Sequence, residues 1–539
     1  MMRPRIYSRI YTRVSGLLTA SPRKGIASMV LVAVWLSASV GPATSARADE
    51  FVDRANALVR KASDEKRSDL VLLPLLPDLK APPAVLTSQY QAALFGNHAP
   101  NWEACKEWVQ AEPQKKVIDA LAKITKDEND PQKGFVFGLP YGADGAGPEL
   151  VTKEMYVELG DPATLAAAKF LYMDKFEIVG ILMHVEASRL AETGDIVGAM
   201  DKMKQWLFFT RQIADRPFLR EKKWAMESML AALERMCDLA YVDFRSEKHT
   251  TEPSKLKDLI DLLRDRSLYL DRVKLPEADL IAREQLVSRV LIEKGGTNAD
   301  TFGPTMAKIG SVDRPLRLFS SAAFWDQARA LHAGWYESKD ALKGLVDDWQ
   351  RRWILPPFDR IQTTRSFWEL RIANRPRFSV IGTGLNDLPS LYSLRRRIDA
   401  QQSGARMSLA AYAFFLRERT IPSSLSAVTP RFTTRVDKDP YSSKGVDILY
   451  TRPLVDTPKS DRGEPKPYTI RLFPAPPRPE LSRRLDNTHF VVYSVGPDEK
   501  NELAIDCTQG QEGRSGDYLF WPPQLSLERQ RLLDTGDLK

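Results

Sequence analysis

A long succession of helix-length amphipathic segments in the middle of the chain constrains the fold more than any other feature. Apolar residues recur there at intervals of three and four, in the segments 178–192, 197–213, 224–243, 255–271, 277–294, 320–336 and 339–353. This spacing places the apolar side chains on one face of a helix. Gly194 and Asp195 separate the first two segments; glycine commonly ends a helix and aspartate commonly caps the next one. We therefore expect stacked antiparallel helical hairpins.

The C-terminal third has a different pattern. We expect a helix over about 388–419, interrupted near Ser403-Gly404, and then short strands up to about residue 522. A chain of 539 residues is too long for one core. The predicted fold class is mostly α, with stacked helical hairpins followed by a small C-terminal α+β module that contains a short antiparallel sheet. The predicted regions are 1–48 (signal peptide), 49–149 (N-terminal mixed and helical region), 150–385 (helical-hairpin domain), 386–525 (α+β module) and 526–539 (C-terminal tail).

The first 48 residues have the features of an export signal. They contain seven basic residues and no acid, an apolar stretch over 26–40, and the small-residue site Ala46-Arg47-Ala48 before Asp49. The apolar stretch favours a cleaved signal, with an uncleaved anchor as the alternative. We expect export to the periplasm or cell envelope. No later apolar run has membrane-spanning length, so we expect no membrane span in the mature chain unless the signal stays uncleaved.

The charge balance depends on this segment. The whole chain carries a formal net charge of +8, and removing the seven N-terminal basic residues leaves 8 − 7 = +1. A nearly neutral mature chain lacks the electrostatic footprint of a nucleic-acid-binding protein. We therefore expect a protein partner and no nucleic acid; the oligomeric state is left open.

Three C-terminal segments occur in a recognisable order. Residues 407–428 contain a helix followed by Ile421-Pro422 and a short second helix, Asp439-Pro440-Tyr441 follows, and the pair Tyr493-Ser494-x-Gly496-x-Asp498 and Gly516-Asp517-Tyr518 comes last. Together they resemble the globular domain of the type II secretion system major pseudopilin. The membrane helix and processing site of that family do not precede this module, and a proline-rich insertion over 453–479 separates two strands. The rest of the chain resembles large exported helical proteins of bacteria that have no assigned function.

The resemblance implies a Ca²⁺ site in the last loop, with Asp498 and Asp517 as the best positional matches and Asp506 and Ser494 as further ligands. The loop also holds Glu499 and Glu502, and Ca²⁺ prefers six to eight oxygen ligands from carboxylates and carbonyls. The alternative is an acidic loop that is simply solvated. We expect no other cofactor.

Other candidate sites are weaker. Cys105, Cys237 and Cys507 lie far apart and are expected to be isolated buried thiols. The histidines have no metal-binding spacing, and His184 is expected to be a core residue with hydrogen-bond partners. The run 395–397 of three arginines is typical of a solvated helix face.

Two functional hypotheses follow. The first is an exported, non-enzymatic interaction or scaffold protein with a helical binding surface and a pseudopilin-like C-terminal module. The second is an envelope hydrolase that acts on cell-wall or polysaccharide substrates through two carboxyl groups in a groove. No catalytic motif is present in the sequence, which favours the first.

Overall fold

The computed structural model describes residues 49–126, 134–264, 268, 270, 273–310, 318–382, 385, 387–456, 466–474, 478–509 and 515–538. By its contacts the chain divides into Met1–Arg47 and Ala48–Lys539, and all the described residues belong to the second unit. The predicted signal over 1–48 lies outside the described residues. The predicted boundaries within 49–539 stay predictions.

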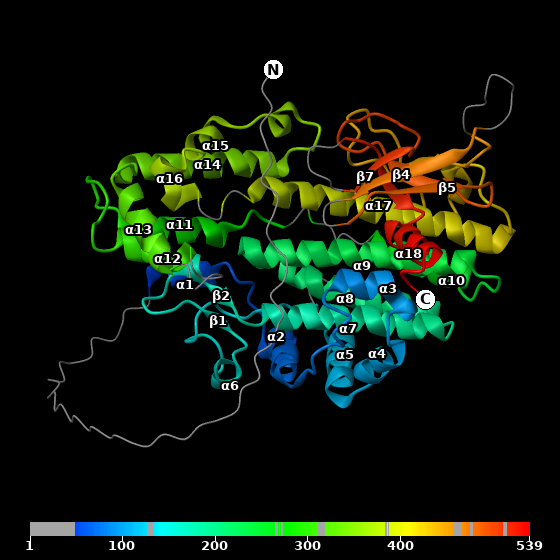
Figure 1. Cartoon of the computed structure of the whole chain (residues 1–539), viewed down its shortest axis with the longest axis horizontal. Coiled ribbons are helices and arrows are strands. Elements are labelled where there is room, and N and C mark those ends of the chain that lie inside the picture. The colour runs from blue at the N-terminus through cyan, green and yellow to red at the C-terminus, as the bar shows by residue number, and fades with distance from the viewer. Residues whose placement is uncertain are drawn as a thin grey trace, which may run out of the picture. The chain divides into compact units, whose positions relative to one another are not determined.

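Helices dominate this unit, as the amphipathic pattern predicts (Figure 1). The first group is α1 (Glu50–Ala57), α2 (Ser68–Leu72), α3 (Gln89–Phe95), α4 (Trp102–Val109), α5 (Glu112–Ile124) and α6 (Pro148–Thr152). The middle group is α7 (Met173–Glu192), α8 (Ile196–Ala214), α9 (Leu219–Arg245), α10 (Pro253–Leu263), α11 (Glu277–Val290), α12 (Phe302–Gly310), α13 (Leu318–Arg329), α14 (Trp335–Ile354), α15 (Phe367–Ile372) and α16 (Arg375–Gly382). The last helices are α17 (Leu388–Glu418) and α18 (Gln524–Thr535).

The hairpin predicted at Gly194-Asp195 is confirmed. Gly194 follows α7 with a φ of 85°, a left-handed conformation that glycine adopts without a steric penalty. The Asp195 side chain then caps α8 by accepting a hydrogen bond of 2.8 Å from the backbone N–H of Gly198. Since the turn is this short, α7 and α8 pack side by side in opposite directions.

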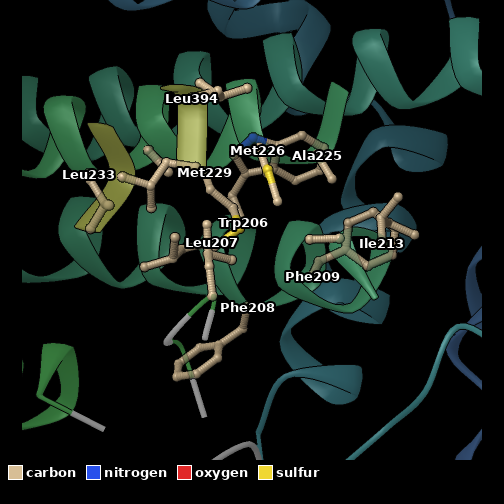
Figure 2. Close-up of a cluster of buried hydrophobic side chains, with 14 of the residues drawn as sticks. Trp206, Leu207, Phe208, Phe209, Ile213, Ala225, Met226, Met229, Leu233 and Leu394 are labelled. Carbon is tan, nitrogen blue, oxygen red and sulfur yellow. The ribbon is translucent and has the colours of Figure 1, made fainter. Parts of the chain in front are cut away.

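The core continues from α8 to α9 and then to α17. Figure 2 shows Trp206 and Leu207 of α8 among Met226 and Met229 of α9, with Leu394 of α17 beside them. All of these side chains are buried. The three long helices therefore form one continuous apolar layer, which removes apolar area from water at roughly 25 cal/mol per Å².

The interruption predicted in α17 is wrong, because the helix runs without a break through Ser403-Gly404. A Cβ atom at Gly404 would lie 2.1 Å from the Cγ atom of Phe520. The glycine thus allows a strand residue to pack directly against the helix backbone. Local propensity suggested a break there, whereas the contact with Phe520 explains the glycine.

The C-terminal module contains two small sheets, one of which packs against α17. One is antiparallel, with the order β3 (Leu449–Thr451), β6 (Val491–Ser494) and β8 (Tyr518–Trp521), which confirms the predicted antiparallel sheet. The other has the order β5 (Leu481–Leu485), β4 (Tyr468–Pro474) and β7 (Asp506–Gln509), and its β4–β7 pair is parallel. The remaining strands, β1 (Val157–Glu158) and β2 (Lys169–Phe170), form a separate short pair. The module therefore combines a helix with an antiparallel and a mixed sheet.

The cysteines and His184 are buried in the core. All three cysteines are free and buried, as expected. His184 is buried, as expected, but neither ring nitrogen has a hydrogen-bond partner among the described residues, so the expectation of partners is wrong. Burial lowers the pKa of His184 to about 3, which keeps the ring neutral.

The arginine run on α17 does not form a solvated face. Arg395 is 4% exposed, donates to the carbonyl of Trp353 at 2.8 Å and lies over the indole ring of that residue. Arg396 and Arg397 donate to the carbonyls of Leu355 and Gln509. The arginines cap the ends of neighbouring segments, because unpaired carbonyls at such ends accept charged donors well.

Within the described ranges, no helix combines the length and the hydropathy that a membrane span needs.

Candidate metal centre in the C-terminal loop

The acidic loop joins the two sheets of the C-terminal module. It leaves β6 at Ser494 and enters β7 at Asp506, and the chain returns in β8. Gly496 has a φ of 67°, and a Cβ atom there would lie 2.1 Å from the carbonyl oxygen of Gly516. Because only glycine tolerates both the left-handed conformation and this approach, the spacing Ser494-x-Gly496 brings the start of the loop against the start of β8.

Ser494 fixes the side chain of Asp439, an acidic residue that precedes the loop in the sequence. Its hydroxyl donates to Oδ1 of Asp439 at 2.8 Å and accepts the N–H of Gly496 at 3.0 Å. The N–H of Val495 donates to Oδ2 of Asp439 at 2.9 Å. Burial raises the pKa of Asp439, while these donors act in the opposite direction. Ser494 therefore fixes the hairpin at Asp439 to the strand that leads into the loop.

Asp517 lies directly before β8, and its side chain contacts the loop between β6 and β7. Its side chain is fully buried, and Oδ2 accepts the N–H groups of Glu502 at 3.1 Å and Ala504 at 2.6 Å. Its backbone joins β7, since the Thr508 N–H donates to its carbonyl at 2.8 Å and its own N–H donates to the Asp506 carbonyl at 3.1 Å. One carboxylate thus organises the return of the loop, and its second oxygen, Oδ1, has no hydrogen-bond partner among the described residues.

Three further carboxylates have an oxygen in the same condition. Asp498 Oδ2, Glu502 Oε2 and Asp506 Oδ1 are inaccessible to solvent and accept no hydrogen bond from the described residues. The other oxygens are engaged: Asp498 Oδ1 accepts from the Lys500 N–H at 3.2 Å, and Asp506 Oδ2 accepts from the Arg471 guanidinium at 2.6 Å. Buried polar atoms are nearly always paired, so four unpaired acidic oxygens in one loop require an explanation.

The electrostatics agree with this geometry. Burial is the main cause that raises the pKa of Asp517 to about 7, and the negative charges of Glu502 and Asp498 raise it further. Burial, and then the negative charges of Asp517, Asp506 and Glu502, raise the pKa of the Cys507 thiol. The loop is therefore a negative, partly desolvated region that a cation would stabilise.

The donor chemistry fits Ca²⁺ in part. Carboxylate oxygens are its preferred protein ligands, and backbone carbonyls usually complete the shell. Within the described residues, no group of three or more histidine, cysteine or acidic side chains is already arranged as a metal site. Binding would therefore require the acidic side chains to rotate toward a common point and carbonyl oxygens to join them. Residues 510–514, in the second half of this region, lie outside the described part of the chain.

The four predicted ligands differ in the hydrogen bonding of their side-chain oxygens. Asp498, Asp506 and Asp517 each have an unpaired buried oxygen, whereas the hydroxyl of Ser494 is bonded to Asp439 and Gly496. The sequence predicted Glu502 as a member of the loop and not as a ligand. In the structure its Oε2 is also buried and unpaired. Asp439 is 55 residues from Ser494, so periodicity along the loop could not associate it with the site.

Comparison of the chain with protein-family models, with curated proteins and with solved structures finds no match. The resemblance to the major pseudopilin therefore stays a prediction.

Proposed function

We propose that the chain is an exported, non-enzymatic interaction protein whose helices α13–α15 present an apolar surface to a protein partner. The observation that carries this proposal is the exposure of large apolar side chains in this part of the chain. Most of those exposed among the described residues lie between residues 324 and 370: Phe324, Leu331, Tyr336, Ile354, Phe358, Ile361, Phe367 and Leu370. Five of them lie on the helices themselves: Phe324, Tyr336, Ile354, Phe367 and Leu370. Large apolar side chains that stay exposed in number are typical of interaction sites.

Two of these helices, α14 and α15, pack against each other, which supports a preformed surface. Arg371 of α15 pairs with Glu337 of α14 at 3.1 Å. Gly344 of α14 lies against Trp368 of α15 so closely that a Cβ atom would be 2.0 Å from the indole ring. Ile354 is 79% exposed and Phe367 is 68% exposed although both belong to these packed helices. A surface formed by helices that are already packed together loses little conformational entropy when a partner binds.

Site-specific photocrosslinking tests the proposal. A photoreactive residue at Phe367, in cells that produce the full chain, should form a crosslink to a defined protein partner. The same residue at Val446, an exposed apolar position in the C-terminal module, is the matched control. The substitution Phe367→Ser should abolish copurification of that partner and change the free energy of unfolding by no more than about 0.5 kcal/mol. Equal crosslinking at both positions, or none at Phe367, would refute the proposal.

Export belongs to the same proposal. The compact unit begins at Ala48, next to the expected cleavage site, and Asp49 caps α1 by accepting the Phe51 N–H at 3.0 Å. We expect envelope-derived protein to begin at Asp49 when its N-terminus is sequenced. An intact Met1 on membrane-bound protein would establish the anchor instead, and a soluble cytoplasmic pool of full-length chain would exclude both.

Calcium binding by the C-terminal loop is the second part of the proposal. The four unpaired carboxylate oxygens support it, and Asp498, Glu502, Asp506 and Asp517 would hold the ion together with backbone carbonyls. A bound cation would offset the repulsion among these acids and fasten β6, β7 and β8 to one another. The role of the metal is thus to stabilise the module.

An envelope hydrolase is the alternative. It would need two carboxyl groups across a groove. The two described cavities contain one acidic side chain each, Asp215 in the smaller and Asp486 in the larger.

A further inference from the structure

The larger cavity is a groove that neither the helical surface nor the acidic loop includes. It has a volume of about 460 Å³ and lies where the end of α9, strand β5 and helix α18 meet. The residues that define it are Tyr241 and Arg245 from α9, Arg483 and Arg484 from β5, His489, and Arg529 from α18. Cavities that bind small molecules typically measure 300–1,000 Å³, so the groove is large enough for such a ligand.

The groove is strongly basic. Four arginines line it, and Asp486 is the one acid among the lining residues. Two of these arginines are neutralised: Arg529 pairs with Asp238 at 2.8 Å, and Arg483 pairs with Asp534 at 2.5 Å.

The other two arginines have no carboxylate partner within the described part of the chain. Arg245 donates to the Thr488 hydroxyl at 3.0 Å and is exposed. Arg484 is also exposed. Two uncompensated guanidinium groups therefore face one groove from two different elements. The planar fork of a guanidinium donates two parallel hydrogen bonds to a carboxylate or phosphate.

The floor of the groove is apolar and aromatic. Leu485, Leu527 and Leu533 line it together with the Tyr241 ring. The His489 ring lies 6.4 Å from the Tyr241 ring at an angle of 33°, and Nδ1 of His489 is 2.7 Å from Oδ1 of Asp486. Burial, and then the positive charges of Arg245 and Arg483, lower the pKa of His489, although Asp486 opposes this. An uncharged ring system of this kind can pack against the body of a ligand.

We propose that this groove binds a small organic anion that has a ring or short apolar body and one carboxylate or phosphate group. The body lies on the floor formed by Tyr241, His489 and the leucines, and the anionic group is bound by Arg245 and Arg484. The groove and the proposed apolar surface on α13–α15 share no residue, so failure of either proposal leaves the other standing.

Isothermal titration of the full chain tests the proposal with three ligands of similar shape. Phenyl phosphate and benzoate carry the two kinds of anionic group, and benzamide is the uncharged control. We expect at least one of the anions to bind, and benzamide to bind at least about tenfold more weakly. Binding of phenyl phosphate alone would assign the groove to phosphates, and binding of benzoate alone would assign it to carboxylates.

Two variants localise the binding. Arg245→Gln together with Arg484→Gln should weaken the binding of the anion about tenfold or more, because charged hydrogen bonds are lost. Arg375→Gln, at an exposed position on α16, removes one positive charge elsewhere and should leave the affinity unchanged. Arg484→Gln alone repeats the test if the double variant does not fold.

Three results would overturn the proposal. The first is the absence of binding by both anions at millimolar concentration. The second is equal binding of benzamide. The third is equal weakening by Arg375→Gln, which would show a response to net charge alone.

Discussion

Replacing Asp517 by asparagine should separate the two possible states of the acidic loop, one held by a cation and one merely solvated. Asparagine keeps an oxygen that can accept the N–H groups of Glu502 and Ala504, while its amide replaces the unpaired Oδ1. The substitution therefore removes the charge and preserves the shape. In wild-type protein without metal, we expect the ionised Asp517 to destabilise the fold.

The size of this effect follows from the pKa. Burial and neighbouring acids raise the pKa of Asp517 from 3.8 to about 7. Each pKa unit corresponds to about 1.4 kcal/mol, so the ionised carboxylate lowers the free energy of unfolding by up to about 4 kcal/mol. Because the folded protein retains the proton more tightly than the unfolded chain, stability in chelator falls as the pH rises from about 4 to about 7 and is then constant.

Calcium should offset this loss. A ligand that binds only the folded state stabilises it by about 2.7 kcal/mol at a hundredfold excess over its dissociation constant. The assay is calorimetric unfolding of the full chain at about pH 8, one unit above the pKa of Asp517, in Ca²⁺, in Mg²⁺ and in chelator. We expect a rise of a few degrees in the melting temperature with Ca²⁺ over Mg²⁺ for the wild type.

Two variants complete the experiment. Asp517→Asn should be at least as stable as the wild type in chelator and should show no response to Ca²⁺. Glu499→Gln is the matched control, because Glu499 lies in the same loop but accepts from the N–H of Ser443 at 2.8 Å and is exposed. It should keep the Ca²⁺ response. A wild type that melts at one temperature in Ca²⁺ and Mg²⁺, or an Asp517→Asn variant that still responds, would show that the loop is only solvated.

Three substitutions test the packing, each measured by urea unfolding. Gly404→Ala should destabilise the chain by about 1–3 kcal/mol, because the clash with Phe520 outweighs a helix-propensity gain of about 1 kcal/mol. Adding Phe520→Leu should restore part of the lost stability, and a stability gain for Gly404→Ala alone would contradict this reasoning. His184→Leu should raise stability by about 1–2 kcal/mol, because it removes two unpaired ring nitrogens from the core. Since the pKa of His184 is lowered to about 3, lowering the pH below about 6.5 should destabilise the wild type more steeply than the variant. Parallel pH profiles of the two proteins would refute the reasoning. Asp238→Asn should destabilise the chain by about 3–5 kcal/mol, because the buried Arg235 and Arg529 lose their carboxylate partner. Asp534→Asn is the control at the exposed ion pair with Arg483 and should change stability by no more than about 1 kcal/mol. Similar values for the two variants would show that burial of the ion pairs made by Asp238 is unimportant.

Much of the candidate site could be predicted from the sequence because its acids lie between the two apolar segments that become β6 and β8. Asp498 follows the apolar segment that becomes β6, and Asp517 directly precedes the apolar segment that becomes β8. Glycine at 496 marks the close approach of those segments. Asp439 reaches Ser494 from 55 residues away, and this pairing depends on how the hairpin folds back. Glu502, unlike Glu499 in the same loop, has a buried unpaired oxygen, which composition does not encode.

The sequence by itself determined the long amphipathic helices α7, α8 and α9 and the turn between the first two. Helical spacing, the left-handed glycine at 194 and the cap at Asp195 act within a few residues, so they operate in any context. Tertiary structure alone decided that α17 passes unbroken through Gly404, that the arginines at 395–397 turn inward, and that β4 pairs in parallel with β7. Each of these depends on a partner that is distant in sequence, such as Phe520 or the carbonyl of Trp353. Their energies arise only when the chain has folded, which is why local patterns indicated a break and a solvated face instead.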